Sequence, residues 1–348
     1  MREDRRTPCP ETRALADGSV DTAFRDVLPE QSTRTEQLHG TAARGGSTER
    51  PHPGYSGGPG PAHGPGPPAA FRRGGPVKIA VGQFAPTAHT AENLQTMRRL
   101  AGEAAASGAE LVVFPEEAML SEHLVEEGFE QLVMDGWSGF VQQLSFLAAE
   151  TGVAVIAGGY ESSADGRPYN TLVTVDARGA ILGTYRKLHL YDAFSNRESD
   201  RIRPGDRGIT VVRIGELSVG MITCYDLRFP EICRAVVDAG AELLAVPAAW
   251  FAGERKVDHW QALLKARAIE NTVWVAAADT CAAHTIGRSA VLDPLGVVVA
   301  EAGEDETVLT AEATRERIDE VREVVPVLAN RRFAPNSTIR DAAGTSGD

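Results

Sequence analysis

Short apolar segments of strand length alternate with amphipathic segments of helix length along most of this chain. Turn-forming residues bound most of the apolar segments, a pattern that predicts buried strands. The expected strands cover residues 78–84, 110–116, 153–161, 169–176, 181–187, 209–214, 217–224, 243–249, 273–280, the two arms of 289–302, and 308–313. The expected helices cover residues 90–108 (with Thr90 as N-terminal cap), 135–152, 229–240, 258–271 and 315–325.

The number of strands decides the fold class. Roughly a dozen strands are more than one sheet usually holds, so we expect two packed sheets covered by helices. The hairpins at residues 209–224 and 289–302 pair neighbouring strands antiparallel, so the sheets are mixed rather than purely parallel. The sequence therefore predicts an α/β fold with two mixed sheets.

The chain changes character near residue 76. Residues 45–76 are dense in glycine and proline, and the segment before them is polar and charged. Such a composition cannot bury enough apolar surface to offset the entropy lost on ordering. We expect a disordered tail over residues 1–75, one folded domain over 77–335 and a flexible C-terminal tail over 336–348.

Charge and composition exclude several classes of partner. The net charge of −13 and the pI near 5.2 make binding to nucleic-acid phosphates unfavourable. No segment approaches the roughly 18 consecutive apolar residues of a membrane span, and the N-terminus lacks the apolar run of a secretory signal. We expect a cytoplasmic protein that binds neither nucleic acid nor membranes and that uses no metal or other cofactor. Neither a zinc pattern nor a disulfide scaffold fits the spacing of the four cysteines, Cys9, Cys224, Cys233 and Cys281.

A carboxylate follows the strand expected at residues 110–116. Because a strand cannot continue normally past Pro115, Glu116 leaves the sheet at a fixed position. A partly desolvated carboxylate at such a place can act as a general base. A surface acidic pair of Glu116 and Glu117 at a strand end is the alternative for this segment.

A lysine ends the strand expected at residues 181–187. If Lys187 points inward, it needs a carboxylate partner. If it lies on an edge strand, its charge limits aggregation and has no catalytic meaning.

Cys224 is expected at the end of the strand at residues 217–224, on a tight turn before a helix that starts near Pro230. A nucleophile on such an elbow is exposed at the sheet edge, and the amides that follow it can bind an oxyanion. A nearby cation or helix start makes a thiol more thiolate-like. The alternative is a small buried hydrophobe, which describes Cys233 and Cys281 well.

The three groups in the order Glu, Lys, Cys resemble the nitrilase superfamily of carbon–nitrogen hydrolases. The resemblance extends over residues 77–335, which it identifies as a carbon–nitrogen hydrolase domain. It implies an α-β-β-α four-layer sandwich that assembles as a homodimer or a larger homo-oligomer. The matching segments are FPEE (114–117), YRKLHLYD (185–192), CYDLRFPE (224–231), LLKARAIENTVWV (263–275), GRSAVLDPLG (287–296) and VLANRRF (327–333).

The resemblance also implies a mechanism. Cys224 would attack an amide carbon to form a thioester, and Glu116, chosen over Glu117 by the family's Pro-Glu register, would serve as the base. Lys187 and the backbone N–H of Tyr225 would stabilise the oxyanion, and Lys187 would lower the pKa of the thiol.

Substrate preference is implied by two further segments. The YDAF (191–194) and YDLR (225–228) segments look like the branch of ω-amidases and deaminated glutathione amidases, whose linear substrates carry a carboxylate and an amide. Glu198 matches the position of a second active-site glutamate in that branch. Arg228 can bind a substrate carboxylate with two parallel hydrogen bonds, but a structural ion pair with Asp226 or Glu231 is an equal alternative.

Other functions stay open on the sequence alone. A nitrile or N-carbamoyl hydrolase of the same superfamily would use the same residues. A papain-like hydrolase would pair Cys224 with His189, His259 or His284. A catalytically silent interaction module conflicts with the intact Glu–Lys–Cys set, and a redox protein coupling Cys224 to Cys233 conflicts with the turn and helix between them.

Overall fold

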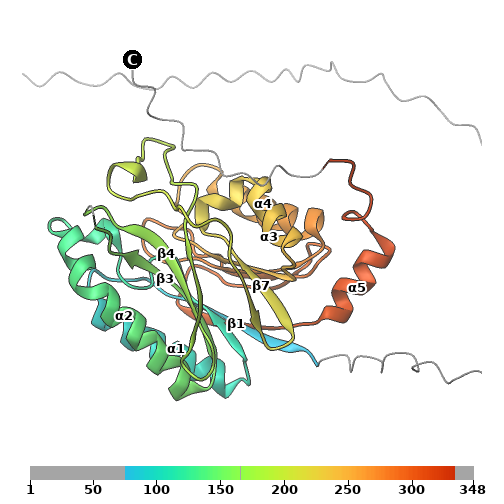
Figure 1. Cartoon of the computed structure of the whole chain (residues 1–348), viewed down its shortest axis with the longest axis horizontal. Coiled ribbons are helices and arrows are strands. Elements are labelled where there is room, and N and C mark those ends of the chain that lie inside the picture. The colour runs from blue at the N-terminus through green and yellow to red at the C-terminus, as the bar shows by residue number, and fades with distance from the viewer. Residues whose placement is uncertain (1–74, 165, 334–348) are drawn as a thin grey trace, which may run out of the picture. The chain divides into compact units, whose positions relative to one another are not determined.

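The computed structural model describes residues 75–333, except residue 165, and shows an α/β fold built on two six-stranded sheets (Figure 1). The tails expected over residues 1–75 and 336–348 lie outside the described residues, apart from Gly75. The first sheet has the order β12-β1-β2-β3-β4-β5, with bounds β1 Val77–Gln83, β2 Leu111–Val113, β3 Ala154–Glu161, β4 Tyr169–Val175, β5 Ile181–Arg186 and β12 Thr307–Ala313. The second has the order β11-β10-β9-β8-β7-β6, with bounds β6 Val211–Ile214, β7 Leu217–Met221, β8 Leu243–Pro247, β9 Trp274–Ala278, β10 Ala290–Leu292 and β11 Val298–Glu301.

Both sheets are mixed, which confirms the predicted class. In the first sheet β1, β2 and β3 are parallel, β12 and β4 flank them antiparallel, and β5 is antiparallel to β4. In the second sheet β7, β8 and β9 are parallel, β6 and β10 flank them antiparallel, and β11 is antiparallel to β10. The β6–β7 and β10–β11 hairpins are the two expected from the turn residues between their strands.

Helices cover the outer face of each sheet and complete the predicted four-layer α-β-β-α sandwich (Figure 1). One pair packs on the first sheet and another on the second, while a further helix follows β12. The bounds are α1 Thr90–Ala106 and α2 Phe129–Thr151 on the first sheet, α3 Pro230–Asp238 and α4 Lys256–Asn271 on the second, and α5 Arg315–Val324 after β12.

The strands read as almost continuous apolar runs because both of their faces are covered. On β2 and β3, Val113 and Ile156 belong to the core that the two sheets share. Their neighbours Val112 and Val155 point the other way and pack in the layer under α1 and α2. The two cores fix the sheets relative to each other, and so fix the strand ends that carry the polar groups.

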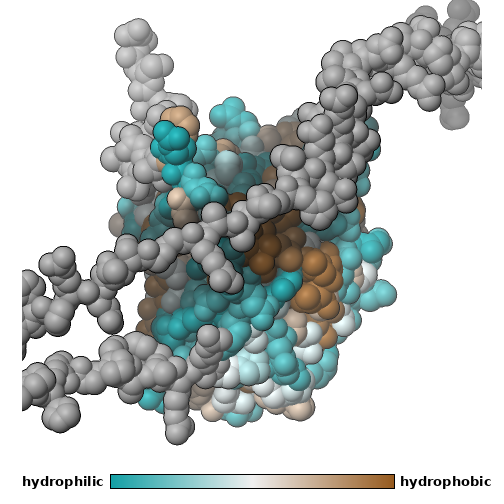
Figure 2. Space-filling view, turned by 90° about the vertical axis from the view of Figure 1, so that its right-hand side faces the viewer, coloured by the Kyte–Doolittle hydropathy of each residue, from teal (hydrophilic) through white to brown (hydrophobic). Residues whose placement is uncertain are grey.

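The surface of the domain combines hydrophilic areas with a compact hydrophobic one on the face shown in Figure 2. Exposed apolar side chains also mark the β10–β11 hairpin: Leu295, Val297, Val298 and Val299. Exposed apolar groups of this kind commonly mark contacts with other proteins. Between residues 75 and 333, no helix has the length and apolar character needed to cross a membrane.

The helix cap expected at residue 90 and the helix start expected at residue 135 are wrong. Thr90 is the first residue of α1 and not its cap; the cap is His89, which makes no side-chain capping bond. Asn93 instead holds the chain before the helix through two hydrogen bonds to the backbone there. The helix expected from residue 135 begins at Phe129, because Gly128 adopts a left-handed conformation (φ 72°) that turns the chain into α2 early.

Candidate active site

Three strand ends bring a carboxylate, an ammonium and a thiol together. Glu116 follows β2, and Lys187 directly follows β5. Cys224 lies beyond the end of β7, where it begins the short 3-10 helix η3 (Cys224–Arg228) and is not on the strand itself as expected. The charges of Glu116 and Lys187 both act on the Cys224 thiol.

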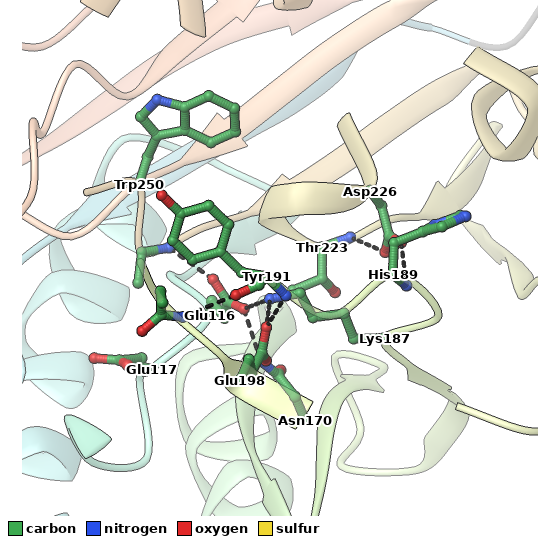
Figure 3. Close-up of polar contacts among 12 residues, drawn as sticks. Glu116, Glu117, Asn170, Lys187, His189, Tyr191, Glu198, Thr223, Asp226 and Trp250 are labelled. Atoms are coloured by element: carbon green, nitrogen blue, oxygen red, sulfur yellow. Dashed lines mark hydrogen bonds and ion pairs between the residues drawn. The ribbon is translucent and has the colours of Figure 1, made fainter. Parts of the chain in front are cut away.

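Lys187 lies between two carboxylates (Figure 3). Its Nζ donates hydrogen bonds of 2.8 Å to Oε1 of Glu116 and of 2.8 Å to Oε2 of Glu198. The sequence-based expectation of an inward lysine with a carboxylate partner is therefore met twice. We call these three side chains, Glu116, Lys187 and Glu198, the buried cluster.

The buried cluster is almost inaccessible to water, with side-chain exposures of 2% for Lys187, 5% for Glu116 and 8% for Glu198. Burial alone lowers the pKa of Lys187, but the charges of Glu116 and Glu198 raise it well above its usual range. Burial raises the pKa of Glu198. The Lys187 charge opposes this shift but is the smaller effect, so the pKa stays raised. Lys187 is the cation that both carboxylates share, so its removal would leave two carboxylates in a dry site without a positive charge.

Neighbouring donors fix both carboxylates. The Asn170 side chain on β4 donates to Glu116 Oε1 at 2.7 Å and to Glu198 Oε1 at 3.2 Å. The backbone N–H of Ala249 donates to Glu116 Oε2 at 2.8 Å, and that of Tyr191 donates to Glu198 Oε2 at 2.6 Å. The Glu116 carboxylate therefore has a defined orientation before any substrate binds.

The adjacent Glu117 belongs to a different environment. It accepts hydrogen bonds from Ser121 Oγ at 2.8 Å and from Tyr160 OH at 3.1 Å. Burial, reinforced by the Glu116 charge, raises the pKa of Glu117 to about 8. Glu117 is therefore neutral at pH 7 and faces away from the lysine that Glu116 contacts, which favours the family's assignment of Glu116 as the base.

The backbone at Cys224 is strained. Its φ of 42° lies in the left-handed region, which costs an L-residue free energy and is found mainly at functional sites. Asp226 holds the turn by accepting from the Thr223 N–H at 3.0 Å and from Tyr185 OH at 2.6 Å. Arg267 supports its far end through hydrogen bonds of 3.0 and 2.7 Å to the Leu227 carbonyl.

The surroundings of Cys224 favour the protonated form of its thiol. Burial and the Glu116 charge raise its pKa well above the usual range, although Lys187 opposes this shift. The expectation that Lys187 lowers the thiol pKa is correct for that one interaction and wrong for the net direction. The proton must therefore leave as the sulfur attacks, and a nearby base is required.

A pocket of about 220 Å³ opens at Cys224. Because part of that volume is open solvent, the pocket suits only a small molecule. Tyr225 belongs to the first turn of η3, where backbone N–H groups lack intrahelical partners and are free to bind an anion. The pocket is lined by Tyr191, Cys224, Tyr225, Arg228, Ala249, Trp250, Phe251 and Lys256.

Arg228 lines this pocket without a carboxylate partner. The ion pair considered with Asp226 or Glu231 is absent, since none of the ion pairs within residues 75–333 includes Arg228, and Asp226 accepts from the Tyr185 hydroxyl instead. The Arg228 guanidinium lies 4.7 Å from the centre of the Trp250 ring. Its buried Nε has no hydrogen-bond partner in the structure.

The histidines considered for a papain-like site have other roles. His189 Nδ1 lies 2.7 Å from Asp226 Oδ1, and the ring stacks on Phe229. His259 Nδ1 lies 3.5 Å from Arg228 Nη2, and His284 packs edge-on against Phe251. In the described part of the chain, no hydrogen bond joins a histidine to the thiol.

The remaining cysteines do not add to the site. Cys224, Cys233 and Cys281 are all free, so no disulfide joins Cys224 to Cys233. Burial raises the pKa of Cys233 to about 12, which fits its expected role as a small buried hydrophobe. Over residues 75–333, no group of His, Cys, Asp and Glu side chains is placed to hold a metal ion.

Three residues of this site were missed by the sequence reasoning: Asn170, Tyr191 and Lys256. Asn170 could have been noticed, because asparagine is depleted in strands and this one interrupts an apolar run. Lys256 gives no such signal, because a lysine near the start of a helix looks like an ordinary surface residue.

Comparison with known proteins identifies the family of this chain. The model of the Carbon-nitrogen hydrolase family matches residues 78–323. The deaminated glutathione amidase of Escherichia coli O157:H7 is 40% identical over 261 residues, covering 74% of this chain and 98% of that protein. Omega-amidase NIT2 of Xenopus tropicalis is 32% identical over 267 residues, covering 73% and 95%.

Solved structures show the same fold. A carbon–nitrogen hydrolase from Helicobacter pylori G27 superposes with a TM-score of 0.69 at 27% identity, covering 74% of this chain and 95% of that one. An amidase variant from Nesterenkonia sp. AN1, with acrylamide added at its active-site cysteine, has a TM-score of 0.62 at 25% identity, covering 72% and 98%. The chain therefore belongs to the carbon–nitrogen hydrolase family of the nitrilase superfamily. It is an amidase that acts on carbon–nitrogen bonds other than peptide bonds.

Proposed function

We propose that this enzyme hydrolyses small, linear, carboxylate-bearing amides through a thioester on Cys224. The observation that carries the proposal is the pairing of two features at one pocket. The charges of the buried cluster act on the Cys224 thiol, and the guanidinium of Arg228 has no acidic partner among the described residues. The first feature suits amide cleavage, and the second suits a substrate that brings its own carboxylate.

The first half of the reaction forms the thioester. Cys224 Sγ attacks the amide carbon while Glu116 accepts the thiol proton, so a free thiolate need not accumulate. Lys187 Nζ and the Tyr225 N–H stabilise the negative charge that develops on the amide oxygen. When the tetrahedral intermediate collapses, the C–N bond breaks and the proton held by Glu116 passes to the departing nitrogen.

The second half releases the acid. Glu116 takes a proton from water, and the resulting hydroxide equivalent attacks the thioester carbon. The C–S bond then breaks, the proton returns to Cys224, and the carboxylic acid leaves. Glu198 acts by holding Lys187 and, with Asn170, the orientation of Glu116.

The substrate class rests on Arg228 and on the relatives. A planar guanidinium matches the two oxygens of a carboxylate, and the pocket is small. Two relatives bear the names deaminated glutathione amidase and omega-amidase. We infer from these points that the carboxylate lies on the acyl part of the substrate, bound by Arg228 while the amide lies at Cys224.

The test is a panel of candidate substrates with the full-length protein. It comprises ω-amides of 2-oxo dicarboxylic acids, deaminated glutathione, neutral aliphatic amides, a nitrile and an N-carbamoyl amino acid, each followed by release of ammonia or amine. We expect the highest kcat/KM for a carboxylate-bearing amide and none for Cys224→Ala. A clear preference for the nitrile or the carbamoyl compound would overturn the amide assignment, and undiminished turnover by Cys224→Ala would overturn the nucleophile.

Trapping the acyl-enzyme separates the mechanism from the substrate. With hydroxylamine present, the wild type should convert a substrate amide to its hydroxamate, because the thioester carbon is attacked by the added nucleophile. Absence of hydroxamate while the amide is still hydrolysed would show direct attack by water. Activity with no member of an extended amide panel would favour a silent interaction module.

Cytoplasmic location and a homodimeric state remain predictions. The exposed apolar side chains of the β10–β11 hairpin offer one surface for self-association. Light scattering coupled to size-exclusion chromatography measures the mass directly, with a single 37.1 kDa chain as the outcome that contradicts the dimer.

A further inference from the structure

A second cation lines the pocket beside Arg228. Lys256 is the first residue of α4, and only 6% of it is exposed to solvent. Its Nζ donates a hydrogen bond of 2.7 Å to Tyr191 OH and lies 4.1 Å from the centre of the Phe194 ring. We call Lys256 and Arg228 the pocket cations.

Neither pocket cation has an acidic partner. Within residues 75–333, no ion pair includes Lys256 or Arg228. The carboxylates of the buried cluster are used by Lys187. Both pocket cations lie over the same Trp250 ring, Arg228 at 4.7 Å and Lys256 at 5.9 Å from its centre.

This placement is unfavourable in the empty pocket. Burial lowers the pKa of Lys256, and the charge of Arg228 lowers it further. The N-terminal end of α4 carries partial positive charge, which also disfavours a cation at its first residue. An anionic group bound between the two side chains would relieve all three effects together.

Both pocket cations have hydrogen-bond donors that the described residues do not use. A lysine ammonium has three N–H donors, and Lys256 uses one of them on Tyr191. Arg228 contacts His259 Nδ1 through Nη2 at 3.5 Å, and its buried Nε has no partner. The two side chains therefore keep donors available for an anionic group.

We propose that Lys256 is a specificity-determining residue that, together with Arg228, forms a two-cation subsite for the terminal carboxylate of the acyl group. The preferred substrates are then ω-monoamides of dicarboxylic acids, and neutral amides of the same length are poor substrates. This inference rests on the proposed function and adds to it the residue that reads the far end of the substrate. Arg228 offers a planar pair of donors, and Lys256 a point charge for the remaining lone pairs of the same carboxylate.

The kinetic test compares glutaramate with pentanamide, a neutral amide of the same five-carbon chain in which a methyl group replaces the carboxylate. Lys256→Met should raise KM for glutaramate and lower kcat/KM about 10- to 100-fold. The loss for pentanamide should be at least tenfold smaller. Lys256→Arg should recover part of the preference because it restores the charge. Lys265→Met, the same change at an exposed position of the same helix, is the matched control and should behave as the wild type.

A binding measurement keeps the inference independent of turnover. Calorimetry with glutarate and the Cys224→Ala protein should show binding that Lys256→Met weakens at least tenfold, with an unchanged melting temperature as the check of folding. Equal losses for glutaramate and pentanamide, or glutarate affinity that does not depend on Lys256, overturns the subsite. Lys256-dependent binding of glutarate by a wild type that cleaves neither amide would instead overturn the proposed function and leave the subsite intact.

Discussion

In the buried cluster, one ammonium meets two carboxylates at 2.8 Å each, whereas the pocket cations, in the described part of the chain, meet no carboxylate at all. The buried cluster is complete before substrate arrives, so its geometry can serve any amide. The pocket cations are incomplete until a ligand supplies negative charge. The reactive groups are therefore in place before the substrate binds, whereas the contacts that select the substrate form only when it supplies a negative charge.

The difference also separates two kinds of mutational effect. Removing Lys187 from the buried cluster leaves two buried carboxylates without a cation, so both stability and kcat should fall. Removing a pocket cation relieves repulsion in the free enzyme, so stability should be kept or improved while KM rises.

The largest effect is expected for Lys187→Met. The change leaves Glu116 and Glu198 facing each other without a cation, which should lower the free energy of unfolding by about 3–5 kcal/mol. Hydrolysis should fall by a factor on the order of 10³ or more, because the oxyanion also loses its charged donor. Urea unfolding and amide release measure the two effects. A stable and active variant would show that neither the stability nor the activity of the protein depends on the buried cluster.

Glu116→Gln should abolish most activity with little loss of packing. The base that takes the thiol proton is removed, and general-base contributions are typically 10²- to 10⁴-fold, so we expect a fall in kcat of about 10³. The matched variant is Glu117→Gln, the same change one residue along the chain. Because Glu117 is already neutral at pH 7, its amide variant should retain most activity. If the two variants exchanged these results, Glu117 would be the base.

Glu117 also makes a prediction about stability and pH. Its pKa is raised from 4.5 to about 8, so between these values the folded protein keeps a proton that the unfolded chain has released. The unfolded state then binds fewer protons, and the free energy of unfolding falls as pH rises, by up to about 1.4 kcal/mol per pH unit from this group. Glu117→Gln should remove that slope between pH 5 and pH 7.5. The exposed Glu127→Gln serves as the control, and an identical slope in Glu117→Gln and wild type contradicts the assignment.

The pair Glu116 and Glu117 shows what the sequence could and could not provide. Strand periodicity predicted the two mixed sheets and placed Glu116, Lys187 and Cys224 at strand ends, because buried strands leave a clear apolar record. Which glutamate faces the lysine depends on how the chain turns after Pro115, and only the family resemblance chose between them. The net rise of the Cys224 pKa also required the structure, since burial outweighs the Lys187 charge there.

The second half of the site was less accessible from sequence. Glu198 came from the resemblance, because a loop glutamate carries no periodicity. Lys256 was missed because α4 begins at that residue, two positions earlier than expected. The helix begins there because the preceding residue, Arg255, adopts a left-handed conformation with a φ of 60°. Long-range pairs such as Lys256 with Tyr191 join segments that nothing in the local pattern connects.

Arg228→Met tests the pocket cations from the other side. It should lower kcat/KM for glutaramate about 10- to 100-fold, mainly through KM, with a much smaller change for pentanamide. Arg228→Lys should give an intermediate value, because it keeps the charge but loses the two parallel donors. The exposed Arg178→Met, whose side chain is 89% exposed, is the control. A fall in kcat larger than the rise in KM would show that Arg228 takes part in the chemical step and not mainly in substrate binding.

The smallest effect is expected for Tyr191→Phe. The Tyr191 hydroxyl accepts the hydrogen bond that Lys256 donates. The centre of its ring lies 5.1 Å from that of Tyr225 and 5.5 Å from that of Phe251. Phenylalanine keeps those ring contacts and removes the anchor, so Lys256 must be ordered by the substrate alone. We expect KM for glutaramate to rise about three- to tenfold with kcat almost unchanged.

Two further variants sharpen this reading of Tyr191. Tyr169→Phe deletes a hydroxyl that binds Asp206 and does not line the pocket, so its kinetics should match the wild type. In a Lys256→Met background, Tyr191→Phe should have no additional effect on glutaramate, because the hydroxyl acts through the ammonium. If the losses of kcat/KM from the two substitutions multiply instead, Tyr191 contacts the substrate directly. The group of residues that bind the substrate would then comprise Arg228, Lys256 and Tyr191, and only the buried cluster would be complete before substrate binds.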